Sequence, residues 1–209
     1  MNPFTFYMPT RLVFGPGRLA ELGTTAHFPG TKALLVVGQG GSARRSGSLE
    51  RVRGLLASRG VGVVVYDRIR PNPEVAQVEE AARIAQAEGC DVVVGLGGGS
   101  TIDSAKSIAV MAKNPGRYWD YMMSGTGGRK TPTHGALPIV AITTTAGTGT
   151  EADPWTVISN PETREKIGWG CDATFPALSI IDPELMTTLP PKQTAYTGMD
   201  ALFHSVEAY

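Results

Sequence analysis

Short apolar segments alternate with helical ones along the first half of this chain. Runs rich in valine and leucine predict strands at residues 11–14, 32–37, 61–66 and 91–96. Helical spacing or composition predicts helices between and after them, at residues 18–22, 49–58, 73–88 and 100–111. Continuous apolar strands separated by helices indicate a parallel sheet that is covered on both faces. The predicted fold class is therefore α/β, with a parallel Rossmann-like sheet flanked by helices.

The second half of the chain is less regular. Residues 114–133 are polar and predict a surface excursion whose aromatic residues Tyr118, Trp119 and Tyr121 form either a lid or, the favoured interpretation, a packed anchor. Two further apolar runs predict sheet strands at residues 138–142 and 177–181, and residues 156–159 and 166–169 predict a hairpin.

A single helix is predicted from Gln193 to Tyr209, where the chain stops. An apolar helical face needs a partner, so we expect a chain that continues beyond this point. We therefore expect a dinucleotide-binding α/β domain over residues 1–190, and over residues 191–209 the first helix of an incomplete all-helical metal-binding domain.

Glycine and polar residues follow three predicted strands, at residues 38–42, 71–73 and 97–100. The carboxyl ends of parallel strands share one edge of the sheet, so one small molecule could touch all three segments. Gly97-Gly98-Gly99 opens a helix, which predicts a phosphate cradle made of backbone amides; the alternative is a tight turn that binds nothing. The loop is not a Rossmann fingerprint, because Ser100 replaces the third glycine, and it is not a Walker A loop, because no Gly-Lys-Ser/Thr follows.

Two further patterns leave alternatives open. The hydroxyl-rich residues 143–151 are suited to binding a nucleotide or sugar, or to satisfying their own backbone in a turn. Asp200 and His204 are spaced i, i+4 on one helix face, which suits half of an iron, zinc, manganese or nickel site, although a surface hydrogen-bonded pair is the commoner meaning of this spacing. His27 and His134 have no matching ligands nearby in the sequence.

Composition excludes several classes of protein. The 19 basic residues balance 19 acidic ones, and no basic run is longer than Arg44-Arg45, which argues against nucleic-acid and membrane-surface partners. No apolar run approaches the length of a membrane span, and no secretory leader precedes residue 11. Cys90 and Cys171 have neither zinc spacing nor the density of a secreted scaffold, so we expect two buried thiols in a cytoplasmic protein.

Four motifs in order carry a family resemblance: GGGSTIDSAK (97–106), TTTAGTGTEAD (143–153), IIDPELMTTLP (180–190) and TGMDALFHSVEAY (197–209). Together they resemble the iron-containing (group III) alcohol dehydrogenases, in particular the NADP-dependent butanol dehydrogenase branch. The resemblance implies reversible hydride transfer between NAD(P) and a primary alcohol or aldehyde, a bound Fe²⁺ or Zn²⁺, and a homodimer or higher homo-oligomer. It does not indicate which alcohol is the substrate.

The resemblance also implies roles for individual residues. Gly98, Gly99 and Ser100 match the pyrophosphate loop, and Asp103 matches the acidic residue that faces the nicotinamide, which is the candidate catalytic residue. Asp200 and His204 match the first two of four metal ligands, the others being histidines further along the family's chain. The remaining matches are to cofactor-binding positions: Asn72 on the ribose side, Thr144, Thr145 and Thr148 in the hydroxyl-rich segment, Lys166 beside the cofactor, and Leu185 to Leu189 as a backbone wall.

The segment after the first long strand bears on the choice of cofactor. NAD-preferring relatives carry an acid at the position of Gly38, whereas this chain continues through Gly41 and Ser42 to Arg44 and Arg45. Without the acid, a 2′-phosphate meets no repulsion and finds hydroxyl and guanidinium donors, which predicts NADP(H) over NAD(H). The alternatives within the superfamily are a zinc-using glycerol dehydrogenase, a maleylacetate reductase or a dehydroquinate synthase-like enzyme. An alternative of another class is a nucleotide-binding fragment without catalysis.

Overall fold

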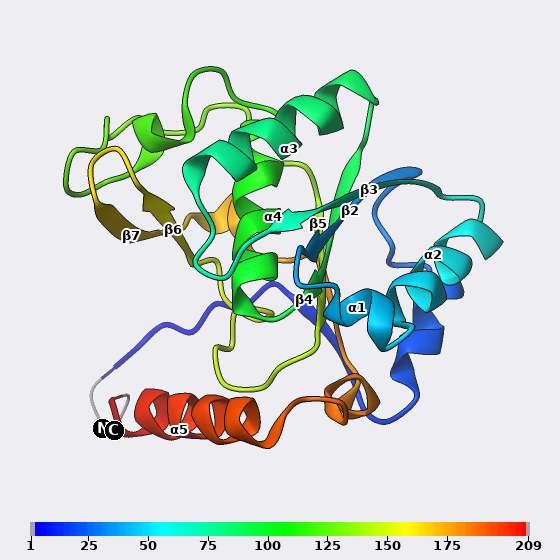
Figure 1. Ribbon diagram of the computed structural model, residues 1–209. Coiled ribbons are helices and arrows are strands. Elements are labelled where there is room, and N and C mark those ends of the chain that lie inside the picture. The colour runs from blue at the N-terminus through cyan, green and yellow to red at the C-terminus, as the bar shows by residue number, and fades with distance from the viewer. Residues whose placement is uncertain (1–2, 208–209) are drawn as a thin grey trace.

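The computed structural model describes residues 3–207 of the chain. One sheet of six parallel strands forms its centre, and helices cover both faces (Figure 1). Along the sheet the strands are β1 (Arg11–Phe14), β8 (Leu178–Ile181), β5 (Ile139–Thr143), β4 (Val92–Gly97), β2 (Lys32–Gly38) and β3 (Gly62–Ile69). The predicted α/β class and parallel sheet are confirmed, and β1 is an edge strand.

Alternate side chains of the central strands enter two separate apolar cores. On one face, Leu34 and Val36 of β2 pack in the core that includes α3 (Val75–Ala87) and α4 (Gly99–Met111). On the other face, Leu35 and Val37 pack in the core that includes α2 (Ser48–Ser58) and the 3₁₀ helix η1 (Arg18–Gly23). A strand that is buried on both faces is apolar at nearly every position, and this pattern allowed these strands to be predicted from the sequence.

The order of the strands creates a crevice at the carboxyl edge of the sheet. From β2 the chain moves outward to β3, then returns to place β4 on the opposite side of β2 before moving outward again to β5. The connections that leave β2 and β4 therefore diverge to opposite faces, and ligands of open α/β sheets bind at such a switch point. Residues 38–42 and 97–100, which follow these two strands, flank this crevice.

An antiparallel hairpin of β6 (Thr156–Asn160) and β7 (Glu165–Trp169) projects from the main sheet, as predicted. Its attachment is a parallel bridge between Ser159 and Glu74, with the Ser159 amide donating to the Pro73 carbonyl at 2.8 Å. The bridge fixes the hairpin against the turn that precedes α3.

The excursion at residues 114–133 is a packed loop around the 3₁₀ helix η2 (Tyr118–Tyr121). All three of its aromatic residues, Tyr118, Trp119 and Tyr121, are buried, and the Tyr118 hydroxyl bonds Ser107 and Thr156. The interpretation as an anchor is confirmed, and the alternative of a lid is wrong.

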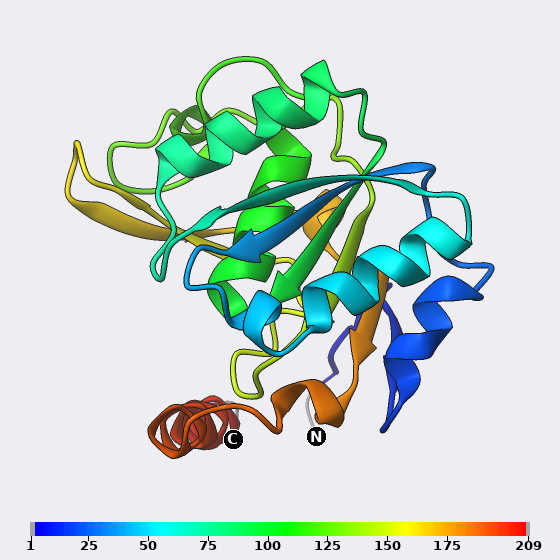
Figure 2. The same cartoon turned by 45° about the vertical axis from the view of Figure 1, so that its right-hand side comes forward.

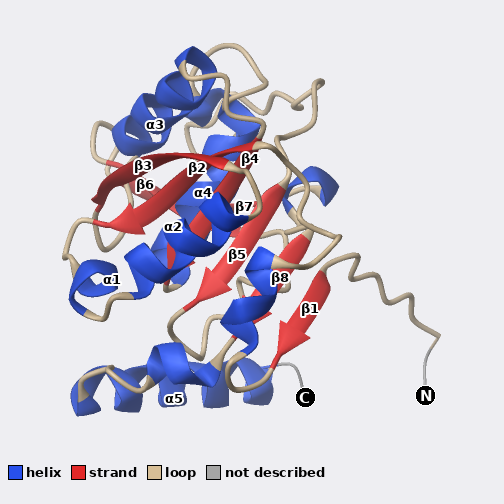
Figure 3. Ribbon diagram, turned by 90° about the vertical axis from the view of Figure 1, so that its right-hand side faces the viewer, coloured by secondary structure: helices blue, strands red, loops and turns tan. Residues whose placement is uncertain are grey.

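Helix α5 (Pro191–Glu207) runs beneath the carboxyl edge of the sheet, and the arrowheads of β1, β5 and β8 point toward it (Figure 3). Figure 2 shows it set apart from the sheet and its covering helices. Residues 191–207 include no buried side chain, and Leu202 and Phe203 are more than half exposed. The last two residues of the predicted helix, 208 and 209, lie outside the described residues. Between residues 3 and 207, no helix combines the length and apolarity needed to cross a bilayer.

Three local expectations need correction. Serine is a favoured N-cap residue, so the sequence predicts that Ser42 caps the helix after β2, but α1 (Ser42–Arg45) begins at Ser42 itself, after Gly41 in a left-handed conformation with φ of 69°. Helix α4 begins at Gly99, one residue before the predicted start at Ser100. Its N-cap residue is Gly98, which has no side chain that could cap the helix. Of the two cysteines, Cys90 is buried but Cys171 is only half-buried, since it lies at the rim of its core.

Candidate functional site

Gly97, the last residue of β4, lies close to Thr101 of α4, and the next two glycines lie close to threonines of the loop after β5. An added Cβ would lie 2.5 Å from Thr101 Oγ1 at Gly97, 2.9 Å from Thr145 Oγ1 at Gly98 and 2.9 Å from Thr148 Cγ2 at Gly99. Larger residues would therefore force the threonines away. The loop ends at the N-terminus of α4, where free amides and the helix dipole favour an anion.

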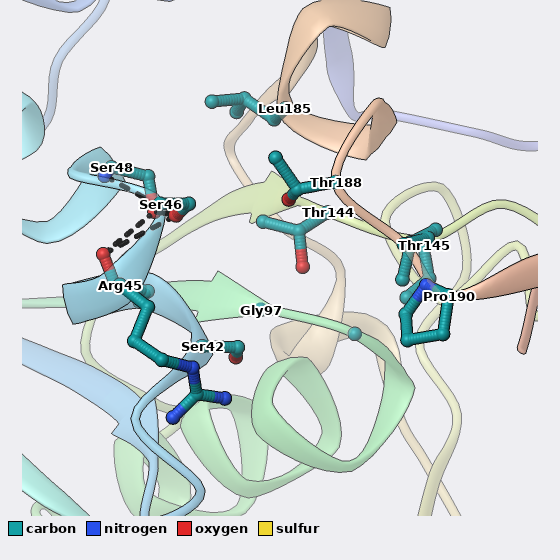
Figure 4. Close-up of a pocket in the computed structure, with 13 residues that line it drawn as sticks. Ser42, Arg45, Ser46, Ser48, Gly97, Thr144, Thr145, Leu185, Thr188 and Pro190 are labelled. Atoms are coloured by element: carbon teal, nitrogen blue, oxygen red, sulfur yellow. Dashed lines mark hydrogen bonds between the residues drawn. The ribbon is translucent and has the colours of Figure 1, made fainter.

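A cavity of about 410 Å³ lies on one side of this loop (Figure 4). Hydroxyls supply much of its polar character, and leucines and a proline form the opposite wall. Its lining consists of Ser42, Ala43, Arg45, Ser46, Ser48, Gly97, Gly98, Thr144, Thr145, Leu185, Thr188, Leu189 and Pro190. These residues come from α1, α2, the ends of β4 and β5, and the segment around the 3₁₀ helix η4 (Pro183–Met186).

The two arginines of α1 have different surroundings. Arg44 Nη2 forms an ion pair with Asp67 Oδ2 at 2.7 Å. Arg45 lines the cavity, and its Nη1 donates to the Gly40 carbonyl at 2.6 Å. Of the two arginines, Arg45 is therefore the one with access to this cavity.

A second cavity, of about 510 Å³, lies on the other side of the glycine loop. Its lining joins the turn before α3, the start of α4, the 148–157 segment, β7 and α5. The residues are Asn72, Pro73, Gly99, Ser100, Asp103, Thr148, Thr150, Asp153, Trp155, Val157, Lys166, Asp200 and His204. Both cavities are open to solvent, and the glycine loop contributes to each.

Asn72 and Lys166 meet at the edge of the second cavity. Lys166 Nζ donates to Asn72 Oδ1 at 2.8 Å. Lys166 lies opposite Ser159 in the hairpin, and Ser159 is bonded to Pro73, so the register of the hairpin sets this contact. Asn72 adopts a left-handed backbone with φ of 55°, which asparagine tolerates better than most residues.

Asp103 lies in the wall of the second cavity with both carboxylate oxygens engaged. Oδ1 accepts from the Thr150 hydroxyl at 2.7 Å, and Oδ2 accepts from the Val157 amide at 2.9 Å. Burial raises the pKa of this carboxyl above its usual value, and these two hydrogen bonds oppose the shift. Asp103 is thus held rigidly rather than left free to swing.

Asp200 and His204 both line the second cavity from α5. His204 Nε2 lies 3.6 Å from Asp200 Oδ1, and both side chains are well exposed. This separation allows one cation to contact both atoms, and a carboxylate with an imidazole suits iron or zinc. Within residues 3–207, no group of three or more candidate metal ligands comes together, so these two residues supply a partial ligand set.

Most of the residues singled out in the sequence gather around these two cavities. Gly38 and Gly41 line neither: they shape the turn after β2, and a Cβ on Gly41 would meet Arg45 Nη1 at 3.1 Å. In the hydroxyl-rich segment, Thr143 bonds the backbone of its own turn at the Thr145 carbonyl, as one alternative predicted. Thr144, Thr145 and Thr148 line the cavities, and their binding of a nucleotide stays a prediction.

Several lining residues were not predicted. Pro190 ends the quoted IIDPELMTTLP motif, one residue after the predicted backbone wall, and Asp153 ends the TTTAGTGTEAD motif, so both belonged to motifs that the sequence had singled out. Trp155 carried no signal that the residue pattern could reveal. Lys106, which binds Asp153, was part of a quoted motif but received no role.

Comparisons with known proteins show to which family the chain is related. The sequence profile described as iron-containing alcohol dehydrogenase matches residues 9–183. The chain is 39% identical, over its whole length, to a probable NADH-dependent butanol dehydrogenase of Bacillus subtilis, of which it covers 52%.

Solved structures are similar as well. The crystal structure of an NADH-dependent butanol dehydrogenase from Thermotoga maritima superimposes with a TM-score of 0.91 and 37% identity, over 99% of this chain and 51% of that one. A sulfoacetaldehyde reductase from Bifidobacterium kashiwanohense, solved in complex with NAD⁺, has a TM-score of 0.90 and 32% identity, over 100% of this chain and 54% of that one.

The chain thus spans about half the length of the relatives it matches. The profile match covers well over half of this chain's residues, and the superposition on a solved relative covers 99% of the chain. The chain belongs to the iron-containing alcohol dehydrogenase family.

Proposed function

We propose that the full-length protein is a metal-dependent alcohol dehydrogenase that exchanges a hydride between NAD(P) and a primary alcohol or aldehyde. One observation carries the proposal: two cavities adjoin a glycine loop at a helix N-terminus, which suits the two halves of a dinucleotide joined by a diphosphate. The adenosine half is assigned to the first cavity and the nicotinamide half to the second.

The chain's own residues have distinct tasks in this proposal. Gly98, Gly99 and Ser100 bind the diphosphate through backbone amides, since their side chains are absent or small. Asn72 and Lys166 bind the ribose on the nicotinamide side, where their mutual hydrogen bond orients both polar groups. Asp103, fixed by Thr150 and Val157, faces the reacting ring as an oriented carboxylate.

Asp200 and His204 are proposed to hold Fe²⁺ or Zn²⁺ together with further ligands of the full-length protein. Their position supports the assignment, because they line the cavity proposed for the nicotinamide rather than the one proposed for adenosine. A cation held there would supply Lewis-acid chemistry to a substrate oxygen, next to the cavity proposed for the nicotinamide.

The proposed coenzyme is NADP(H). The two similar butanol dehydrogenases are named NADH-dependent, so the proposal stands on this chain's own residues. Gly38 places no carboxylate at the end of β2, and Arg45 with Ser42 offers donors on the adenosine side. A 2′-phosphate would gain charge-assisted hydrogen bonds there.

The proposal extends to location and assembly. The two cysteines are free, which suits the reducing cytoplasm. The edge strand β1 exposes Phe14, and the segment before it exposes Phe4 and Phe6, which supports a homo-oligomer. Sedimentation at several concentrations tests the assembly.

A turnover assay tests the activity. The full-length protein, supplied with NADPH, a short aldehyde and either Fe²⁺ or Zn²⁺, should oxidise the coenzyme as the aldehyde is reduced. Coenzyme binding without turnover under any metal would favour a nucleotide-binding protein without catalysis. Oxidation of glycerol in preference to primary alcohols would favour the glycerol dehydrogenase alternative.

A further inference from the structure

Lys106 is a fully buried lysine in α4, one turn beyond Asp103, and none of the tasks described above uses it. Its ammonium has acceptors on every side. They are Thr150 Oγ1 at 2.8 Å, Asp153 O at 2.8 Å, Trp155 O at 2.9 Å and Asp153 Oδ1 at 3.1 Å. All of these acceptors belong to residues 150–155, so a single ammonium group forms hydrogen bonds along this segment.

The same segment is bound at two points to Asp103. The Thr150 hydroxyl accepts from Lys106 and donates to Asp103, and the Val157 amide donates to the other carboxylate oxygen. We call residues 150–157 the clamp segment. Helix α4 thus holds the clamp segment through a cation and a carboxylate that lie on the same side of the helix.

The clamp segment forms one wall of the second cavity. Thr150, Asp153, Trp155 and Val157 all line that cavity, whereas no clamp residue lines the first one. The charge of Lys106 is therefore connected to one half of the proposed coenzyme site and not to the other.

The energetics of burial make this arrangement sensitive. A buried ammonium is tolerated only when it is paired and hydrogen-bonded, and Asp153 provides the ion pair at 3.1 Å. Burial lowers the pKa of Lys106, and the nearby Asp153 opposes that shift. Removing the ammonium would leave the Asp153 carboxylate and two carbonyls without their shared donor.

We propose that Lys106 is a positioning residue for the reaction: it fixes the clamp segment against α4 and so holds Asp103 and the wall of the nicotinamide cavity in their working geometry. The inference rests on the proposed function and deepens it. It separates Lys106 from residues that bind coenzyme, since Lys106 acts through Thr150, Asp153 and Trp155.

The test compares four variants of the full-length holoenzyme. Lys106→Met removes the charge at similar length, Thr150→Val removes the hydroxyl between Lys106 and Asp103, and Thr150→Ser keeps it. Ile108→Ala is the control for stability, because Ile108 is fully buried on the same helix but packs in the apolar core. The readouts are kcat with NADPH and a short aldehyde, the Kd of ADP as a probe of the first cavity, and acrylamide quenching of tryptophan.

Lys106→Met should lower kcat about 100-fold and Thr150→Val about 10-fold. Thr150→Ser should recover most of the activity that Thr150→Val loses, and Ile108→Ala should stay within about twofold of the wild type. The Kd of ADP should change less than about twofold in all four variants, because the first cavity contains no clamp residue. Quenching should rise in Lys106→Met. Trp155 is 59% exposed and its carbonyl loses its bond to Lys106, whereas Trp119 and Trp169 are buried.

Three results would overturn the proposed role of Lys106 and leave the proposed function intact. They are an unchanged kcat in Lys106→Met, a parallel loss of ADP binding in that variant, or an equal loss of kcat in Ile108→Ala. If Lys106→Met does not fold, the comparison of Thr150→Val with Thr150→Ser tests the proposal instead. Equal kcat values in these two variants would overturn the role of Lys106. If the wild type binds neither ADP nor NADPH, the proposed function fails, and the role of Lys106 fails with it.

Discussion

Lys166 Nζ and Asn72 Oδ1 lie 2.8 Å apart although 94 positions separate them in the sequence. The contact depends on the hairpin, because Ser159 joins β6 to the turn before α3 and places the facing Lys166 over Asn72. The proposed ribose site depends on this arrangement, because two polar groups are held together at the edge of a cavity and a ribose has neighbouring hydroxyls that both donate and accept.

Lys166→Ala should raise the Kd of NADPH about tenfold, because one charged donor to the ribose is lost. Thermal stability should hardly change, since an exposed polar contact contributes little to folding. Fluorescence titration measures the Kd. Lys130→Ala is the matched control: Lys130 is an exposed lysine that is also paired, 2.8 Å from Asp120, but lies outside both cavities. Equal affinity in Lys166→Ala and the wild type would contradict the assignment.

Arg45→Ala should raise the Kd of NADP⁺ about tenfold and leave the Kd of NAD⁺ within twofold, because only the former carries the 2′-phosphate that the guanidinium would bind. Arg44→Ala is the control, since Arg44 is paired with Asp67. Calorimetry of the wild type and both variants with each coenzyme gives the dissociation constants needed. An equal loss of affinity for NADP⁺ and NAD⁺ in Arg45→Ala would show that Arg45 does not bind the 2′-phosphate.

Gly98→Ala should weaken binding of both coenzymes by at least about tenfold, because its Cβ would lie 2.9 Å from Thr145 Oγ1 and narrow the loop where the diphosphate sits. Gly54→Ala is the comparison, because a Cβ on Gly54 meets nothing within 4 Å. That change in α2 should stabilise the protein by up to about 1 kcal/mol and leave coenzyme affinity unaltered. An unchanged Kd for both coenzymes in Gly98→Ala would contradict the proposal that this loop binds the diphosphate.

Asp200→Ala and His204→Ala should each leave the full-length protein with far less bound metal, because each removes a ligand from the same ion. Elemental analysis after anaerobic reconstitution with Fe²⁺ or Zn²⁺ measures the ratio of metal to protein. Glu207→Ala, which removes a carboxylate from the same helix outside the cavity, should keep the wild-type ratio. Full metal content in Asp200→Ala would refute the proposed ligand.

Asp91→Asn should reduce stability at neutral pH by about 1–2 kcal/mol. The Asp91 carboxylate accepts from the Thr31 amide and hydroxyl and from the Lys32 amide, which ties β4 to the start of β2. Burial pushes the Asp91 pKa upward, but these hydrogen bonds together outweigh it, so the pKa lies below the ordinary 3.8.

A depressed pKa in the folded state means that the carboxylate stabilises the fold above pH 3.8 and that this contribution is lost as the pH falls through the lower folded value. Urea unfolding should therefore show a gap between Asp91→Asn and the wild type at pH 7 that closes in this acid range. Glu50→Gln, which alters an exposed ion pair with Arg53, should show little gap at pH 7. A gap of constant size across the range would contradict the linkage.

The sheet was predictable because its central strands are apolar at every position. Leu34 to Val37 and Val92 to Val94 are buried on both faces, and such runs cannot belong to an exposed segment. The order of the strands was not predictable. Pairing of β1 with β8 joins the two ends of the domain, and the four-residue run of β1 carries no information about its neighbour.

The candidate site was predicted unevenly for a physical reason. Glycines and hydroxyl residues after strands lie at one edge of a parallel sheet, so Gly98, Gly99 and Thr145 could be grouped from sequence alone. The Asn72–Lys166 contact requires the register of a hairpin, and the buried position of Lys106 opposes the usual exposure of lysine. Neither is encoded in a local pattern.

The two cavities on opposite sides of one glycine loop have a practical consequence for protein engineering. Because α1 and α2 contribute to one compartment, the hairpin and clamp segment contribute to the other, and no residue lines both, we expect the effects of substitutions in these parts to add. Coenzyme preference and substrate range could then be evolved in separate libraries and the best variants combined afterwards.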